Sequence, residues 1–193
     1  MIAFVLGNGR SRLKTNPASL KNHGTIYVCN AIYRYFIPDI LVAVDPKMVT
    51  ELLENNIQQL TNVWTNPHSR YDKNSELNFF KPSLGWSSGT TALHMASKFH
   101  TTIYILGFDY EGDNDNTMIN NVYAGTNNYR PLIDPPTYSN NWKRQTDDVI
   151  KNNPTINYIR VVDDKFNQHF NLDKYINYSA INYDHFNEKF QKS

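Results

Sequence analysis

Short apolar segments alternate with amphipathic segments along the chain. Apolar runs without polar alternation predict strands that are buried on both faces. Such runs occupy residues 2–6, 25–29, 40–44, 62–65, 102–106 and 156–162. Apolar residues at helical spacing predict helices over residues 16–24, 46–53, 88–99 and 142–151. Strands that alternate with helices in this way predict an α/β, Rossmann-like fold, in which helices cover both faces of a mostly parallel sheet.

Two polar segments interrupt this alternation. Residues 66–81 show no clear period and are predicted to form a loop. Residues 111–141 are rich in Asn, Asp, Gly and Pro, and a loop of this length is usually functional or mobile, so we interpret it as a lid. The Rossmann-like domain is expected to span residues 1–162. Residues 163–193 are rich in Phe and Tyr and are predicted to be an extension that packs on the domain or on a partner subunit.

Charge and composition argue against several classes of protein. Lys and Arg number 19 against 18 for Asp and Glu, so the formal charge is only +1, and no nucleic-acid partner is expected. No apolar run reaches the roughly 20 residues of a membrane span. The first residues lack the basic region of a signal peptide. The single Cys29 cannot form an internal disulfide, which fits a reducing compartment, so we expect a cytoplasmic protein.

Asparagine is the most unusual component of the sequence. The chain contains 26 Asn, more than Lys and Arg together. They are dispersed, which favours codon usage in an AT-rich genome, as in a phage or a small-genome bacterium, over a prion-like segment. An individual asparagine is therefore a functional candidate only where its position singles it out.

Chemically interesting residues follow the predicted strands at their carboxyl ends. Ligands of parallel α/β sheets bind at that edge. A glycine loop follows the first strand, and a Ser-Gly pair opens the helix at residue 88, where N–H groups and the positive end of the helix dipole favour phosphate. The sequence thus predicts a nucleotide-type ligand. The residues at this edge are Gly7, Asn8, Gly9, Ser11, Asn30, Asp45, Ser88, Gly89 and Asp109.

Familiar motifs are missing from this set. The glycine loop has no following Gly-Lys-Ser/Thr and lacks the third glycine of the dinucleotide fingerprint. Asp45 has two interpretations: it binds a ribose diol or a cation or acts as a base, or it caps the helix that begins at Pro46. Asp113 and Asp115 form an Asp-x-Asp pair, for which a solvated loop is the favoured interpretation. No metal site is predicted from histidine spacing, and no Ser-His-Asp or Cys-His array is evident.

The combination of these motifs resembles the bacterial family-42 sialyltransferases. It also resembles related Rossmann-like proteins, among them hydroxymethylpterin pyrophosphokinases. The resemblance rests on residues 2–11, on Cys29-Asn30 with Tyr33 close behind, on Ser88-Gly89 and on residues 103–109. It covers roughly residues 1–162 in order, with gaps.

The resemblance implies a CMP-sugar donor and no required cofactor. It implies that the glycine loop surrounds phosphate and ribose, that Asn30 lies near base or sugar, and that two tyrosines stabilise the departing phosphate. The implied nucleotide-binding residues are Gly7, Asn8, Gly9, Ser11, Asn30, Ser88 and Gly89, and the implied tyrosines are Tyr110 and Tyr123.

Two departures from that family shift the candidate base. Asp45-Pro46 stands where the family has Asn-Pro, and no histidine occurs between His100 and His169, where the family has its general base. An inverting transfer needs a base to accept the proton of the acceptor hydroxyl. Asp45 and Asp109 are the candidates for this role. Arg130 or Lys143 is a candidate for neutralising the leaving phosphate from a closing lid.

Three hypotheses for function follow. The first is a glycosyltransferase-like enzyme that uses a nucleotide-activated sugar. The second is a diphosphotransferase of the pterin pyrophosphokinase type, in which Asp45 and Asp109 hold Mg²⁺ for ATP. The third is a non-catalytic interaction module that forms a homo-oligomer through the aromatic segment 163–193.

Overall fold

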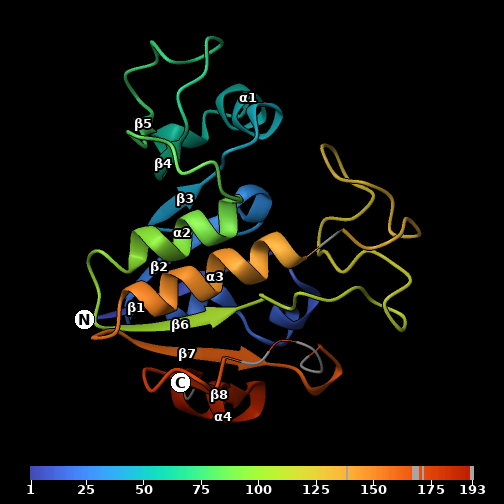
Figure 1. Ribbon diagram of the computed structural model, residues 1–193. Coiled ribbons are helices and arrows are strands. Elements are labelled where there is room, and N and C mark those ends of the chain that lie inside the picture. Colours follow the sequence, from blue (N-terminus) through green and yellow to red (C-terminus); the bar gives the residue numbers. More distant parts are fainter. Residues whose placement is uncertain (138, 167–169, 171, 192–193) are drawn as a thin grey trace.

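A single parallel sheet of eight strands organises the molecule (Figure 1). The computed structural model describes residues 1–137, 139–166, 170 and 172–191. The strand order is β5-β4-β3-β2-β1-β6-β7-β8, and every neighbouring pair is parallel. The strands are β1 (Ile2–Leu6), β2 (Thr25–Cys29), β3 (Ile40–Val42), β4 (Asn62–Thr65), β5 (Asn78–Phe79), β6 (Thr102–Leu106), β7 (Asn157–Val162) and β8 (Tyr178–Asn182).

Helices cover both faces of this sheet, which confirms the predicted α/β, Rossmann-like class. The α-helices are α1 (Pro46–Glu54), α2 (Ser88–Ala96), α3 (Asn140–Asn152) and α4 (Tyr183–Phe190). Short 3₁₀ helices are η1 (Arg10–Lys14), η2 (Pro17–Leu20), η3 (Asn30–Arg34), η4 (Ile57–Gln59) and η5 (Asp164–Phe166).

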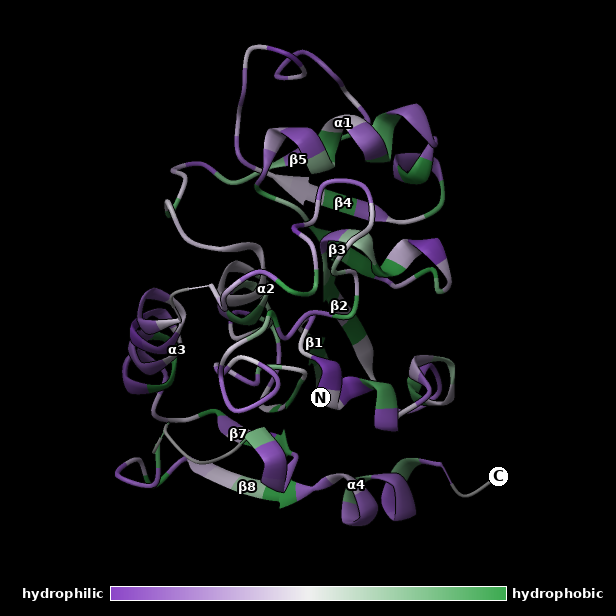
Figure 2. Ribbon diagram, turned by 90° about the vertical axis from the view of Figure 1, so that its right-hand side faces the viewer, coloured by the Kyte–Doolittle hydropathy of each residue, from purple (hydrophilic) through white to green (hydrophobic). Residues whose placement is uncertain are grey.

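Alternating side chains of the strands build two cores. Phe4 and Leu6 of β1 belong to the core under α1 and α4, whereas Ala3 and Val5 belong to the core under α2 and α3. Figure 2 shows hydrophobic residues concentrated on the central strands and hydrophilic residues on the outer helices. The continuous apolar runs in the sequence therefore reflect strands with two covered faces.

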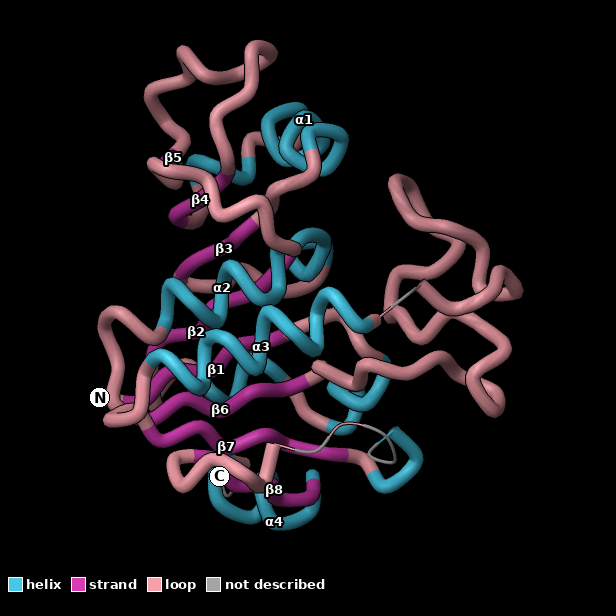
Figure 3. The backbone as a smooth tube through the Cα atoms, viewed as in Figure 1, coloured by secondary structure: helices cyan, strands magenta, loops and turns pink. Residues whose placement is uncertain are grey.

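The strand order reverses between β1 and β6. From β1 the chain builds the sheet outward through β2, β3 and β4 to β5, and it then returns to place β6 on the other side of β1. The crevice outside the carboxyl ends at such a switch point is where ligands of this architecture bind. Figure 3 shows the long loop between β6 and α3 at the same edge of the sheet.

Several elements differ in extent from those predicted. β3 ends at Val42 rather than at residue 44. The segment predicted as a helix over residues 16–24 forms only the 3₁₀ helix η2, which Asn16 caps. The predicted loop over residues 66–81 contributes the two-residue strand β5. A strand this short has too few residues to show a period.

The described part of the C-terminal extension completes the sheet and one core. β8 pairs with β7, and α4 packs against the strands through Phe186 and Phe190. The ring centroids of these two residues lie 6.1 and 5.1 Å from that of Phe4. The described aromatic residues thus pack on the domain, which is the first of the two alternatives predicted for this segment. No helix within the described ranges has the length and apolar character needed to cross a membrane.

Candidate functional site

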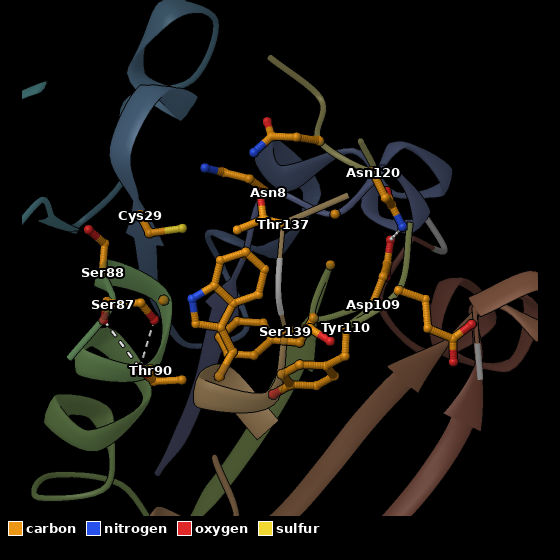
Figure 4. A pocket seen from close by; sticks show the side chains of 18 of the residues that line it. Asn8, Cys29, Ser87, Ser88, Thr90, Asp109, Tyr110, Asn120, Thr137 and Ser139 are labelled. Carbon is orange, nitrogen blue, oxygen red and sulfur yellow. Dashed lines mark hydrogen bonds between the residues drawn. The ribbon is translucent and has the colours of Figure 1, made fainter. Parts of the chain in front are cut away.

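A pocket of about 170 Å³ opens at the switch point (Figure 4). Its walls come from the ends of β1 and β2, the first turn of α2, the end of β6, the lid loop and the start of α3. The lining residues are Gly7, Asn8, Gly9, Cys29, Asn30, Ser87, Ser88, Gly89, Thr90, Gly107, Phe108, Asp109, Tyr110, Glu111, Ile119, Asn120, Asn121, Pro136, Thr137, Ser139 and Trp142.

Most of the residues predicted from the sequence meet in this pocket. Those that line it are Gly7, Asn8, Gly9, Asn30, Ser88, Gly89, Asp109 and Tyr110. Ser11, Asp45 and Tyr123 lie outside the lining. The predicted set therefore divides into residues that can touch a ligand and residues whose contacts are with the protein itself.

Ser11 supports Asp109 from behind the pocket. Its backbone N–H donates to Oδ2 of Asp109 at 3.1 Å, and its hydroxyl donates to Oδ1 of the same carboxylate. The hydroxyl of Tyr183, from α4, lies 3.0 Å from the Ser11 hydroxyl. Ser11 thereby links the carboxylate to the C-terminal part of the fold.

Asp45 caps α1. Its Oδ1 accepts a hydrogen bond from the backbone N–H of Lys47 at 2.9 Å, and its side chain is exposed. This geometry is the helix-cap alternative that the sequence left open. Asp45 does not line the pocket, whereas Asp109 does. Within the described residues, no group of three or more His, Cys, Asp or Glu side chains is arranged to hold a metal ion.

Tyr123 belongs to the lid loop and points into the body of the domain. Its hydroxyl accepts a hydrogen bond from Nη2 of Arg12 at 2.8 Å and donates to the hydroxyl of Tyr35 at 3.2 Å. Burial raises the pKa of Tyr123 above its ordinary value. Arg12 is itself buried, and its guanidinium lies over the rings of Tyr35 and Tyr123. These contacts attach the lid loop to the body of the domain.

The glycines of the first loop allow two loops to approach closely. A Cβ atom on Gly9 would lie 2.4 Å from Oδ2 of Asp109, and one on Gly7 would lie 2.6 Å from the carbonyl oxygen of Gly107. The N–H groups of Gly7 and Gly9 donate to the carbonyls of Leu106 and Gly107. These N–H groups, which the sequence suggested for phosphate, are therefore used to join the ends of β1 and β6.

The first turn of α2 offers N–H groups instead. The first N–H groups of a helix have no acceptor within the helix. The N-cap residue Ser87 makes no side-chain cap bond, because its hydroxyl pairs with Thr90 and with Oε1 of Gln145. Ser88 places its Oγ against the backbone N–H of Val44 at 3.0 Å, which fixes this turn beside the end of β3. An anion in the pocket would meet the positive end of the helix.

Asn8 and Asn30 place buried amide oxygens at the ends of β1 and β2. Oδ1 of each side chain is shielded from solvent and has no hydrogen-bond partner among the described residues. Nδ2 of Asn8 donates to the hydroxyl of Tyr129 at 3.3 Å, which leaves its oxygen as the unused group. Buried polar atoms without a partner are uncommon in native proteins. Two such acceptors in one pocket suit donors on a ligand, such as ribose hydroxyls or an exocyclic amino group.

Asp109 is the most buried carboxylate of the pocket, with 6% of its surface exposed. Burial raises the pKa of this carboxyl above its usual value, and the hydrogen bonds from Ser11 and Asn120 and the charge of Arg160 oppose that shift. Asn120 donates to Oδ2 at 3.0 Å. An ionised carboxylate has about four acceptor positions. Ser11 and Asn120 occupy all but about one of them, which leaves room for one donor from a ligand.

Tyr110 presents its ring rather than its hydroxyl to the pocket. The hydroxyl is buried against Oγ1 of Thr146 in α3. The backbone of Tyr110 has a φ of +60°, and that of Asn30 has a φ of +58°. Positive φ is costly for a bulky side chain and clusters at functional sites. Both residues lie at strand ends within the pocket.

Several residues of the site escaped the sequence analysis. Gln145 of α3 accepts hydrogen bonds from Ser87 and Thr90, and the Nε of Arg160 in β7 donates to the carbonyl of Phe108 at 3.1 Å. Arg160 was visible as a lone charge in an apolar strand, but Gln145 had no distinguishing signal. Glu111 and Trp142 also line the pocket. Glu111 lies in the lid loop, whose path could not be predicted, and Trp142 lies in a predicted helix, where no motif marked it as a site residue.

The two cations expected to reach the leaving phosphate lie outside the lining. Arg130 pairs with Asp134 at 3.0 Å, and its side chain is half exposed. Lys143 lies in α3 and does not line the pocket. Neither cation contributes to the pocket wall.

Polar contacts fasten one half of the lid loop to α1 and η3. Arg34 donates to Oε1 of Glu51 at 2.6 Å and to the carbonyl of Asn127 at 3.0 Å. Nδ2 of Asn128 donates to the other oxygen of Glu51 at 2.6 Å. We call Arg34, Glu51 and Asn128 the lid clasp. It holds residues 126–128 of the lid loop on the body of the domain.

The fold and the pocket together define a Rossmann-like α/β protein with a pocket at its switch point. Comparisons with known proteins found no match to this chain among protein-family models, curated proteins or solved structures. The resemblance to sialyltransferases and pterin pyrophosphokinases therefore stays a prediction.

Proposed function

We propose that the protein binds a nucleotide-activated sugar in the switch-point pocket and transfers the sugar to an acceptor hydroxyl. The observation that carries the proposal is the combination, in one pocket, of an α2 first turn without a side-chain cap and the unpartnered oxygens of Asn8 and Asn30. The first group suits phosphate, and the second suits the donors of a nucleoside.

The proposed roles follow from these two groups, the uncapped first turn of α2 and the unpartnered asparagine oxygens. The phosphates of the donor lie at the start of α2, where N–H groups of Ser88 and Gly89 and the helix dipole stabilise negative charge. Asn8 and Asn30 accept hydrogen bonds from the ribose or the base. Ser87 and Gln145 hold the first turn of α2 in place.

Asp109 is the proposed base. Its carboxylate accepts the proton of the acceptor hydroxyl while the acceptor oxygen forms a bond to the anomeric carbon of the sugar. The bond between that carbon and the phosphate oxygen breaks, and the phosphate leaves with the electron pair. A raised pKa makes the carboxylate a better proton acceptor than an exposed Asp. Ser11 and Asn120 hold it in position.

Titration calorimetry with CMP-, UDP- and GDP-sugars tests the proposal. We expect one of these compounds to bind, and we expect Asn8→Ala and Asn30→Gly each to weaken its binding by roughly five- to tenfold, the value of one net hydrogen bond. Glycine is chosen at residue 30 because it accepts the positive φ of that position.

Asn22→Ala is the matched control, since Asn22 is exposed and does not line the pocket. It should bind as the unaltered protein does. Failure to bind any nucleotide-sugar, or equal binding by all three variants, would contradict the proposal. Binding of ATP that depends on Mg²⁺ would instead support the diphosphotransferase hypothesis.

A further inference from the structure

A chain of hydrogen bonds runs from α4 to the carboxylate of Asp109. The backbone N–H of Gly107 donates to the hydroxyl of Tyr183 at 3.2 Å, and that hydroxyl lies 3.0 Å from the hydroxyl of Ser11. The Ser11 hydroxyl in turn donates to Oδ1 of Asp109. The side chains of Tyr183, Ser11 and Asp109 are buried, so these bonds compete little with water.

The direction of every bond in this chain follows from which groups can donate. An N–H can only donate, so the oxygen of Tyr183 accepts from Gly107. An ionised carboxylate can only accept, so Ser11 gives its single proton to Asp109. The contact between the two hydroxyls is then left with one donor, which is the hydroxyl of Tyr183. Both hydroxyls therefore direct their protons toward the carboxylate.

The hydroxyl of Tyr183 keeps its proton. Burial raises the pKa of Tyr183 above its ordinary value, so the hydroxyl remains a neutral donor throughout the physiological pH range. A hydroxyl that accepts a hydrogen bond becomes a stronger donor itself, because bonds in a chain polarise one another. The bond from Tyr183 therefore strengthens the bond from Ser11 to Asp109.

The fold fixes the distance between Tyr183 and Ser11. Tyr183 is the first residue of α4, and Ser11 lies in η1. Asn187 of α4 bonds to the end of η1: its Oδ1 accepts from the hydroxyl of Thr15 at 2.8 Å, and its Nδ2 donates to the carbonyl of Lys14 at 2.9 Å. The helix that carries the tyrosine is therefore fastened to the turn that carries the serine.

Other groups face the same carboxylate and are unchanged by a substitution at Tyr183. The N–H of Ser11 and Nδ2 of Asn120 donate to Oδ2 of Asp109, the second at 3.0 Å (Figure 4). The positive charge of Arg160, from β7, also favours the ionised form of this carboxyl. The other titratable side chains that line the pocket are Cys29, Tyr110 and Glu111.

From this chain of bonds, and resting on the proposed function for the role of Asp109 as base, we propose that Tyr183 is a positioning residue. Its hydroxyl acts through Ser11: it fixes the direction of the Ser11 hydroxyl and so favours the ionised form of Asp109, which can accept a proton. A tyrosine of the C-terminal helix, outside the pocket lining, thus sets the proton affinity of a carboxylate within the pocket.

Titration of Asp109 in the ligand-free protein tests this inference. The carboxyl carbon resonance of Asp109, followed by NMR against pH, reports the pKa of this group. We expect Tyr183→Phe to raise that pKa by about half a pH unit or more, because the bond from Ser11 becomes weaker. Ser11→Ala removes the bond and should raise the pKa further.

Tyr158→Phe is the matched control. Tyr158 of β7 is buried, and its hydroxyl lies 2.8 Å from the hydroxyl of Ser97. Ser97 donates to the carbonyl of Leu93, so the same pair of side chains ends on a carbonyl instead of a carboxylate. Tyr158→Phe loses a comparable buried bond and should leave the pKa of Asp109 as it is.

A double variant shows whether Tyr183 acts through Ser11. In the Ser11→Ala background, Tyr183→Phe should cause no further shift, because the bond that it strengthens is already gone. An equal shift in both backgrounds, or an unchanged pKa of Asp109 in Tyr183→Phe, would overturn the inference.

A fluorinated tyrosine at residue 183 covers the case in which Tyr183→Phe does not fold. It keeps the hydroxyl and makes it a stronger donor, so the pKa of Asp109 should fall. A pKa that stays the same or rises would contradict the inference.

The titration needs no ligand, so its outcome is separate from that of the proposed function. If the pKa of Asp109 responds to Tyr183 but no nucleotide-sugar binds, the proposed function fails and the effect of Tyr183 on this carboxylate stands. If transfer is observed, the acid limb of its pH–rate profile should move to higher pH in Tyr183→Phe by the same amount as the pKa. Transfer with an unmoved acid limb would overturn the inference alone.

Discussion

The four α-helices of the described residues differ in how the N–H groups of their first turns are satisfied. α1 and α4 begin away from the pocket, and each has a side-chain cap. In α1, Oδ1 of Asp45 accepts a hydrogen bond from the N–H of Lys47 at 2.9 Å. In α4, Oδ1 of Asn182 accepts a hydrogen bond from the N–H of His185 at 2.8 Å. α2 and α3 begin at the pocket. Their N-cap residues, Ser87 and Ser139, line it and make no side-chain cap bond.

This difference shows that a stabilising side-chain cap and a bound ligand compete for the same N–H groups at the start of a helix. A side-chain cap contributes typically about 1 kcal/mol to a helix, and it occupies an N–H group that a ligand could use. α1 and α4 use the cap. α2 is held by its neighbours instead, since Gln145 of α3 accepts from its N-cap residue and Ser88 accepts from Val44 at the end of β3. The turn is fixed while its N–H groups stay directed at the pocket.

The largest expected effect on stability is at Gln145, because its side chain holds the first turn of α2, which has no side-chain cap. We expect Gln145→Met, which keeps the size of the side chain but removes the acceptor, to lower the free energy of unfolding by about 2 kcal/mol. The reason is that Thr90 and Ser87 lose their buried acceptor. Urea denaturation measures the change. Gln59→Met, at an exposed position, should stay within about 0.5 kcal/mol of the unaltered protein.

A loss at Gln145 no greater than that at Gln59 would mean that α2 is fixed by packing alone. In that case the hydrogen bonds from neighbouring residues that replace a cap in α2 would contribute nothing measurable to the free energy of unfolding.

A smaller effect is expected at the cap of α1. Asp45→Ala should lower the free energy of unfolding by about 1 kcal/mol, because the N–H of Lys47 loses its acceptor. Asp45→Asn keeps a cap and should cost much less. Ligand affinity should be unchanged in both variants, because Asp45 does not line the pocket. Loss of ligand binding in Asp45→Ala with a normal denaturation midpoint would return Asp45 to the list of site residues.

The smallest effect concerns the middle of α1, where Glu51 holds the lid loop. Burial alone would raise the pKa of Glu51, but hydrogen bonds from Tyr33, Arg34 and Asn128 outweigh it and lower the pKa below 4.5. A lowered native pKa gives stability that is present above the unfolded value and is lost as the pH falls through the native value. Amide exchange of residues 126–128 should therefore accelerate in acid before the sheet unfolds.

Glu51→Gln should show faster exchange of the same segment already at neutral pH, because it weakens the ion pair with Arg34. If amide exchange of residues 126–128 has the same pH dependence as amide exchange in the sheet, the lid clasp does not hold this segment independently of the rest of the fold.

The sequence was sufficient to predict the parallel α/β class and most of the strand-end residues of the pocket. Strands buried on both faces produce continuous apolar runs. The carboxyl ends of parallel strands lie at one edge of the sheet regardless of the conformation of the loops. Asn8 and Asn30 could be singled out among 26 asparagines because of their place at that edge.

Contacts between distant segments could not be predicted. Gln145, Tyr183 and Arg160 act through bonds to residues far away in the sequence, and a single sequence holds no record of such pairs. The glycine loop was correctly placed at the edge, but its N–H groups are taken by the end of β6, a pairing that depends on how closely two loops approach. Asp45 had two interpretations because a cap and a ligand position look alike at a strand end.

The contact of Tyr183 with the glycine loop has a consequence for synthesis on the ribosome. Its hydroxyl meets Ser11, which is 172 residues earlier, and the N–H of Gly107, which is 76 residues earlier. Ser11 and Gly107 are therefore translated long before the residue that joins them. A nascent chain that ends before α4 has β1 and β6 but lacks the support behind Asp109. The pocket therefore reaches its final form only after α4 has left the exit tunnel, long after the strands that carry the pocket residues.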